Sequence, residues 1–189
     1  RALANRALVY LTRIDAGEAA KKQFDTANNM TQQQAALSAL LSVEKGAEQA
    51  QAFYRQWKED RLVIDKWFAL QVAFAPPEKA AIVAKSLTQH EDFNWKNPNR
   101  FRAVFGSLAG NMAGFHHLSG QGYELMVKWL SRLDQINPQT AARMCGAFKT
   151  WRQFDKGRQA LLKPLLQNML EMDGLSRDSR EMISRIVHD

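Results

Sequence analysis

Histidine and cysteine are the side chains most able to bind a metal or attack a substrate, and this chain has few of them. A zinc protease motif needs H-E-x-x-H on a helix, so that both imidazoles reach one metal ion. His90-Glu91 is followed by D-F-N, with no histidine at the required place. His116 and His117 are adjacent, so in a helix or strand they would point apart, and we expect loop or interface histidines. The chain itself is therefore predicted to hold no metal and no cofactor.

Nucleotide-binding and nucleophile motifs are also missing from the sequence. Neither G-x-x-x-x-G-K-[ST] nor G-x-G-x-x-G occurs, and S-G-Q-G-Y-E at 119–124 is typical of a turn followed by a helix start. Cys145, the single cysteine, lies beside Met144 and near Phe148, which predicts a buried core thiol and not a nucleophile. We therefore expect no catalytic residue in this chain and no enzymatic activity of the chain by itself.

The arginines offer a positive signal, which begins with the segment N-P-N-R-F-R-A-V-F-G-S-L-A-G-N from Asn97 to Asn111. Asn97 suits a helix N-cap, and Pro98 suits the first turn, where a backbone amide has no intrahelical partner. An apolar face follows at i, i+3, i+4 and i+7, and Arg102 lies off that face. The residues of this face are Phe101, Val104, Phe105 and Leu108.

A similar segment, N-P-Q-T-A-A-R-M-C-G-A-F, begins 40 residues later at Asn137. It carries a polar stripe opposite its apolar residues, formed by Gln139, Arg143, Gly146 and Thr150. The planar guanidinium of arginine can bind a carboxylate through two hydrogen bonds. One hypothesis is that Arg102 and Arg143 line a concave surface that receives a carboxylate or backbone carbonyls. The alternative is an ordinary solvated helix face.

Helical periodicity covers almost the whole chain, and no segment alternates with the period of a strand. About eleven helices with short connections predict an all-α fold, an irregular superhelix of antiparallel helix pairs like the HEAT and armadillo solenoids. Several local features are expected within it. Thr31 should cap a helix, and residues 60–74 should form a helix with a buried stripe that includes Leu62 and Phe74. Residues 110–122 should form a loop, and residues 138 to about 154 should form one helix. Pro164 should interrupt the helix that starts at Asp155.

Composition limits the partners and the location that we expect. The formal net charge is +7 and the pI about 9.7, but no run of five Lys or Arg occurs, so a solvated basic surface is expected and nucleic-acid binding is not. No apolar run approaches the ~20 residues of a membrane helix, so no membrane partner is expected. A single cysteine fits a reducing compartment, which here means the cytoplasm. The chain starts at Arg1 within a helical pattern, which suggests a piece of a longer protein.

Several motifs in the same order resemble the C-terminal helical domain of bacterial aminopeptidase N, a zinc-dependent alanyl aminopeptidase. They are the segment from Asn97 to Asn111, then G-F-H, S-G-Q-G-Y, N-P-Q-T-A-A-R and the basic F-D-K-G-R-Q. The resemblance spans residues 1–189 as a single helical domain of a larger multidomain enzyme. It implies that the zinc ligands lie in a separate catalytic domain of the same polypeptide.

The resemblance also implies a role. The helical domain would cover the active site, enclose an internal cavity and help to bind and admit peptides. Arg102, Gln139 and Arg143 match the family positions that line the substrate channel. Two other classes remain open from the residues alone. One is a free-standing helical-repeat adaptor that binds a peptide or protein on its concave face, and the other, suggested only by the net charge, is a nucleic-acid-binding domain.

Overall fold

The computed structural model describes residues 2–188, and within this range the chain forms twelve α-helices, two 3₁₀ segments and no strand. The first half contains α1 (Ala2–Ile14), α2 (Glu18–Thr26), α3 (Met30–Ser42), α4 (Ala47–Trp57), α5 (Arg61–Ala73) and α6 (Ala80–Leu87). The second half contains α7 (Pro98–Gly110), α8 (Met112–Phe115), α9 (Gln121–Asp134), α10 (Pro138–Cys145), η1 (Gly146–Phe148), η2 (Trp151–Gln153), α11 (Lys156–Leu170) and α12 (Arg177–His188).

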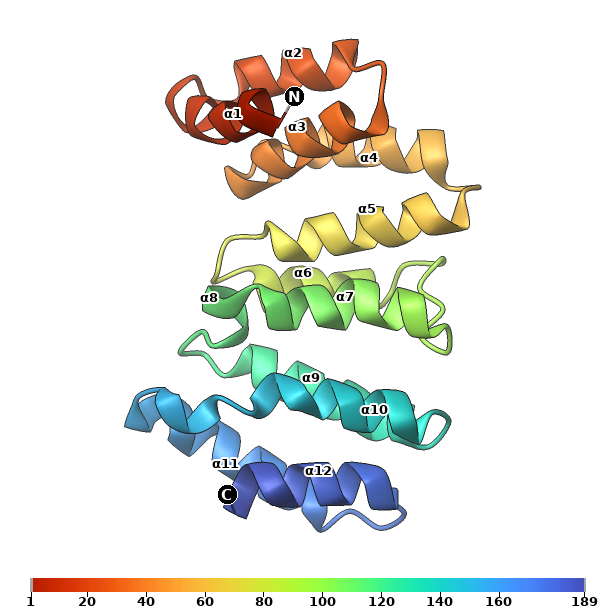
Figure 1. Cartoon of the computed structure of the whole chain (residues 1–189), viewed down its shortest axis with the longest axis vertical. Coiled ribbons are helices and arrows are strands. Elements are labelled where there is room, and N and C mark those ends of the chain that lie inside the picture. The colour runs from red at the N-terminus through yellow and green to blue at the C-terminus, as the bar shows by residue number, and fades with distance from the viewer. Residues whose placement is uncertain (1, 189) are drawn as a thin grey trace.

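The longer helices stack in two layers along one axis (Figure 1). Helices α3, α5, α7, α10 and α12 form the layer nearer the viewer, and α4, α6, α9 and α11 lie behind them. Each helix of the near layer begins at the same edge, on the right in Figure 1, and runs back to the left. The predicted all-α solenoid of antiparallel helix pairs is confirmed.

Asparagine, aspartate and serine side chains cap several of the helices, and the cap predicted at Asn97 is confirmed. The side-chain oxygen of Asn97 accepts a hydrogen bond from the amide of Asn99 at 2.9 Å, and that of Asn137 accepts from Thr140 at 3.1 Å. Asp155 caps α11 by accepting from Arg158 at 3.1 Å, and Ser176 accepts from Ser179 at 3.3 Å near the start of α12. These contacts satisfy amides that the helix itself leaves without a partner.

The predicted cap at Thr31 is wrong, because α3 begins two residues earlier than that cap implies. Asn29 is the N-cap, and its side-chain oxygen accepts from the amide of Gln32 at 3.0 Å. The side-chain nitrogen Nδ2 of Asn29 donates to Oε1 of Gln32 at 2.6 Å. The contact joins two side chains and does not involve the backbone amide of Asn29, so it differs from a capping box, and the cap lies two residues before the start of the T-Q-Q-Q pattern.

The predicted loop at 110–122 contains the short helix α8 (Met112–Phe115). The side chain of Asn111 organises it, because its oxygen accepts from the amide of Gly114 at 3.1 Å. The amide nitrogen of the same side chain donates to the carbonyls of Val72 and Ala75, at 3.0 and 2.9 Å. One asparagine thus joins the end of α7 to the end of α5, which a reading of local periodicity does not detect.

Two expectations about the C-terminal helices are also wrong. The segment from 138 to about 154 is not one helix, because α10 ends at Cys145 and two 3₁₀ segments follow. Pro164 does not interrupt its helix, since α11 continues from Lys156 to Leu170 with the proline inside it. Pro164 is exposed, so the carbonyl that loses its partner at this point can be hydrated.

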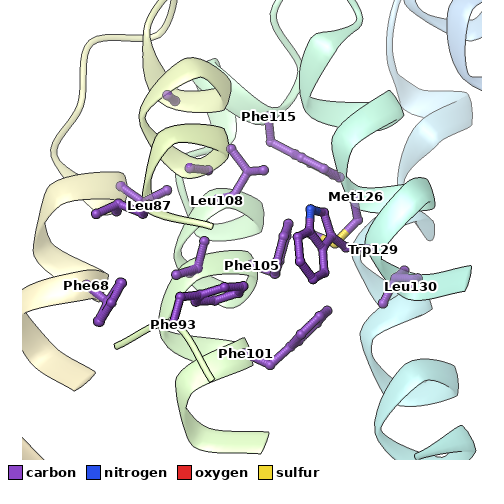
Figure 2. Close-up of a cluster of buried hydrophobic side chains, with 14 of the residues drawn as sticks. Phe68, Leu87, Phe93, Phe101, Phe105, Leu108, Phe115, Met126, Trp129 and Leu130 are labelled. Atoms are coloured by element: carbon purple, nitrogen blue, oxygen red, sulfur yellow. The ribbon is translucent and has the colours of Figure 1, made fainter. Parts of the chain in front are cut away.

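The core is a continuous cluster in which aromatic rings join the layers, as Figure 2 shows for its middle part. Phe101 and Phe105 of α7 stack with their ring centroids 4.6 Å apart, and Phe93 meets the edge of Trp129 of α9 at 5.4 Å. The apolar face predicted for α7 is confirmed, since all four of its residues are fully buried. The stripe predicted for residues 60–74 is wrong at its two ends, where Leu62 is 71% exposed and Phe74 is 40% exposed.

An ion pair and a backbone contact fix the start of α7. Arg100 is buried, pairs with Asp65 of α5, donates to the backbone carbonyl of Asp92 and lies over the ring of Phe68. Both ends of α7 are therefore tied to α5, the end by Asn111 and the start by Arg100. Within residues 2–188, none of the helices combines the length and the apolar character needed to cross a membrane.

Candidate functional site

Arg102 lies on the exposed side of α7, opposite the buried phenylalanines. Its Nε donates to the backbone carbonyl of Pro98 at 3.2 Å, and its Nη2 donates to the side-chain oxygen of Asn99 at 2.6 Å. The guanidinium is thus held over the first turn of its own helix. No acceptor within the described residues binds its Nη1, so part of the fork remains free to bind a ligand.

Gln139 and Arg143 are exposed on α10, and neither has a side-chain hydrogen bond or ion pair within residues 2–188. The apolar residues predicted for the opposite face are Ala141, Met144, Cys145 and Phe148, of which Met144 is half-buried and the other three are fully buried. The polar and apolar faces of α10 are therefore exposed and buried as the sequence periodicity predicts, although the helix ends before Thr150. Whether Gln139 and Arg143 contact a peptide remains a prediction.

The three predicted site residues, Arg102, Gln139 and Arg143, belong to two helices of the same layer. Helices α7 and α10 lie in the same layer, run in the same direction and begin at the same edge (Figure 1). Gln139 is the second residue of α10 and Arg102 is the fifth residue of α7, so both lie in the N-terminal halves of their helices, toward that edge. The near layer thus places two guanidinium groups and one amide on neighbouring parallel helices, a pattern suited to extended backbone and carboxylate groups.

His116 and His117 lie in the turn between α8 and α9, as predicted, but only His117 keeps part of its side chain at the surface. His116 is 3% exposed, stacks on Phe154 with a centroid distance of 3.8 Å, and has its Nδ1 2.8 Å from the hydroxyl of Tyr123. Burial, together with the charge of Arg158, lowers the pKa of His116 to about 4. The imidazole is therefore neutral at physiological pH and packs as part of the core.

Cys145 is fully buried, as predicted, and burial is the main cause that raises the pKa of its thiol to about 12, with the charge of Asp134 adding to the effect. A thiol with this pKa is a poor nucleophile near neutral pH. In the range 2–188, no three or more His, Cys, Asp or Glu side chains form a group that could hold a metal ion.

The basic F-D-K-G-R-Q motif has a structural role. Asp155 caps α11 and pairs with Arg158, while the Nε of Arg158 donates to the backbone carbonyl of His116. Gln159 donates to the carbonyls of Arg152 and Phe154 at 2.9 and 2.7 Å. These contacts hold the start of α11 against the turn between α8 and α9, so the motif does not form a free basic surface.

One cluster was missed by the sequence reasoning. The guanidinium carbon of Arg132, in the last turn of α9, lies 4.6 Å from the ring centroid of Trp129 and 5.2 Å from that of Trp95. The two indoles meet edge-on at 6.0 Å. The spacing of Trp129 and Arg132 by three residues was a local signal, because such residues are neighbours on a helix. Trp95 belongs to the distant connection before α7, and periodicity does not reveal its approach.

Stacked antiparallel helix pairs, with parallel helices within a layer, define the class of α-solenoids built from armadillo or HEAT repeats. The chain belongs to the family described as "Domain of unknown function (DUF3458_C) ARM repeats", whose family model matches residues 1–188.

Named relatives agree with the motif resemblance. The chain is 37% identical over 191 residues to aminopeptidase N of Haemophilus influenzae, covering 99% of this chain and 22% of that protein. It is also 37% identical over 169 residues to aminopeptidase N of Escherichia coli, covering 88% of this chain and 19% of that protein. The resemblance to aminopeptidase N is confirmed, and the chain spans about a fifth of the length of these relatives.

A solved structure shows the same fold. The crystal structure of Legionella pneumophila aminopeptidase A in complex with aspartic acid superimposes with a TM-score of 0.89 and 32% sequence identity. The similarity covers 97% of this chain and 22% of that one. The solenoid is therefore a domain that the relatives carry within a much longer polypeptide.

Proposed function

We propose that this chain is a non-catalytic domain of a zinc aminopeptidase, in which it caps the active site, encloses the internal substrate cavity and helps to bind and admit peptides. The observation that carries the proposal is the identity of 37% to two aminopeptidases N over most of the chain, together with exposed arginines on α7 and α10, which run parallel in one layer. The partners in this proposal are the catalytic domain of the same polypeptide and peptide substrates, and the location is the cytoplasm.

The proposed contribution of the domain is to hold the part of a peptide beyond its N-terminal residue. Arg102 is held over the first turn of α7, which lowers the side-chain entropy lost when it binds a ligand. Arg143 has all its donors free within the described residues and can turn toward a carbonyl or a carboxylate. Gln139 supplies both a donor and an acceptor, which suits a peptide group. Such contacts favour substrates long enough to reach them.

Zinc in this proposal is bound by the catalytic domain and not by this chain. The residues described here do not fit the metal, since His116 is enclosed by Tyr123 and Phe154 and the thiol of Cys145 is buried. No chemical step is therefore assigned to this domain. The 189-residue chain is expected to lack peptidase activity of its own.

The test compares the 189-residue chain with the intact polypeptide that contains it, using an alanyl reporter amide. We expect hydrolysis by the intact polypeptide, loss of that hydrolysis after treatment with a chelator, restoration by zinc, and no hydrolysis by the 189-residue chain under any of these conditions. Peptidase activity of the isolated chain would contradict the proposed division of roles. An intact polypeptide without peptidase activity would favour the helical-repeat adaptor instead.

A further inference from the structure

Three arginines in residues 2–188 lie over aromatic rings, and only one of them has no hydrogen-bond acceptor. Arg100 over Phe68 pairs with Asp65, and Arg152 over Trp151 donates to the carbonyls of Ile186 and Val187. Arg132 lies over both Trp95 and Trp129, but no acceptor among the described residues binds any of its donors. The rings therefore hold its guanidinium in place while its N–H groups face solvent.

This arrangement is suited to capture an anion. Contact with two indoles restricts the rotamers of Arg132 before a ligand arrives, so less entropy is lost on binding. The stack also leaves the edge of the planar guanidinium open, and this edge matches the two oxygens of a carboxylate. Trp129 is 6% exposed and Trp95 is half-buried, so the support is anchored in the core.

The surrounding charges also favour an anion. Lys128 lies one helical turn before Arg132, and Lys96 follows Trp95, and both lysines are exposed. The nearest carboxylate in sequence, that of Asp134, is buried and accepts hydrogen bonds from the backbone amide of Ser176 at 2.7 Å and from its hydroxyl at 2.5 Å. The carboxylate of Asp134 is therefore already engaged by two donors.

The position of the stack relates it to the proposed peptide surface. Trp95 lies two residues before Asn97, the cap of α7, and Arg132 lies five residues before Asn137, the cap of α10. Both helices begin at the edge on the right of Figure 1. The stack is therefore located where the helices that carry Arg102 and Gln139 start.

We propose that Arg132, supported by Trp95 and Trp129, is a binding site for the C-terminal carboxylate of a peptide that lies along α7 and α10. This inference rests on the proposed function and adds a specificity for peptides with a free C-terminus. A peptide long enough to reach the edge where α7 and α10 begin ends beside a guanidinium with free donors. A C-terminal amide carries no charge and gains less from the same contact.

The test measures binding of three peptides to the 189-residue chain by calorimetry at low ionic strength, where exposed charge contacts are least screened. The peptides are Ala-Ser-Ala-Ser-Ala as a free acid, the same sequence as a C-terminal amide, and an amide whose last residue is Glu. We expect the free acid to bind about three- to fivefold more tightly than its amide, the range for one exposed charge pair. We expect the Glu-ended amide to bind as weakly as the plain amide.

Arg132→Gln is expected to remove this difference, so that the free acid and the amide bind equally. Trp95→Leu should reduce the difference while keeping the charge, because one supporting ring is lost. Arg55→Gln is the matched control, since Arg55 is exposed on α4 with no aromatic ring beneath it, and it should keep the full difference. Unchanged circular dichroism would show that each variant is folded.

The outcomes separate this inference from the proposed function. Binding that is weakened by Arg102→Ala but equal for the free acid and the amide would overturn the carboxylate site and leave the peptide surface intact. An Arg132→Gln variant that keeps the preference for the free acid would also overturn the carboxylate site and leave the peptide surface intact. Equal affinity for the free acid and the Glu-ended amide would overturn the assignment to a C-terminal carboxylate. No binding of any peptide would contradict both proposals.

Discussion

The Nδ1 of His116, in the turn between α8 and α9, lies 2.8 Å from the hydroxyl oxygen of Tyr123, in the first turn of α9. The imidazole stacks on Phe154 on the other side, and the backbone carbonyl of His116 accepts a hydrogen bond from Arg158. Residues from three separate segments therefore enclose one neutral histidine. The stability of the solenoid near its middle should depend on the protonation of this group.

The first prediction is that acid weakens the fold through His116. Its pKa is about 4 in the folded state, below the ordinary value of 6.5, because burial and Arg158 disfavour the imidazolium. Between these pH values the unfolded chain binds a proton that the folded chain does not, so stability falls as the pH is lowered through this window. His116→Gln should remove this contribution, which we expect to be about 3 kcal/mol.

Urea unfolding of both proteins at a series of pH values measures the effect, and the quantity to compare is the loss of stability between neutral and acidic pH. His117→Gln is the matched control, because His117 is the adjacent residue and is less buried. It should keep the wild-type pH dependence. A pH dependence unchanged by His116→Gln would show that the imidazole does not resist protonation in the folded state.

The second prediction concerns two glycines four residues apart in sequence. A Cβ added to Gly114 would lie 2.4 Å from the Cβ of Ala80, so Gly114→Ala should force α8 away from α6 and cost ~1–3 kcal/mol. A Cβ added to Gly110 meets no atom within 4 Å, and Gly110→Ala should stabilise the protein by ~0.4–1 kcal/mol by restricting the unfolded chain. Chemical denaturation of both variants tests this, and equal stability of the two would contradict the close packing of α8 on α6.

The third prediction uses Cys145 as a reporter of unfolding. Its side chain is fully buried, and its thiol pKa is raised to about 12, mainly by burial. Labelling with a disulfide reagent at mildly alkaline pH should be slower than labelling of the denatured chain by on the order of a thousandfold, since reaction requires opening of the fold. Because Cys145 is the only cysteine, the measured rate belongs to this site. Rapid labelling of the native protein would place the thiol at the surface.

Local rules predicted the helices and several of their starts, because the signals for them lie within a few residues. The sequence predicts a cap at Asn97 and the starts of further segments at Asn137 and Asp155, because a side-chain oxygen before an amphipathic run is sufficient for such a prediction. The short helix α8 was missed, because Asn111 stabilises it with help from the carbonyls of Val72 and Ala75, which lie far away in sequence. The failed prediction for Leu62 has a related cause, since the burial of a helix face depends on which neighbour covers it.

The candidate site also combines features that local sequence rules predict with features that only the structure shows. The exposure of Arg102 and Arg143 opposite apolar faces follows from periodicity within each helix. The parallel arrangement of α7 and α10 in one layer depends on how the helices stack, and local sequence rules do not predict it. Only the structure shows the support of Arg132 by Trp95, because the two residues are 37 positions apart and Trp95 belongs to a connection between helices.

The central claim, that Arg102 on α7 contacts the part of a peptide beyond its first residue, is tested most directly by substrate length. In the intact polypeptide, Arg102→Ala should lower kcat/KM for a five-residue peptide by about 10- to 150-fold, as expected for loss of one charge-assisted hydrogen bond. The value for a single-residue alanyl amide should change by less than about twofold, because that substrate is too short to reach Arg102. Arg55→Ala, on α4 in the other layer, should leave both values unchanged. The claim would be contradicted if Arg102→Ala lowered kcat/KM equally for both substrates, or left it unchanged for both.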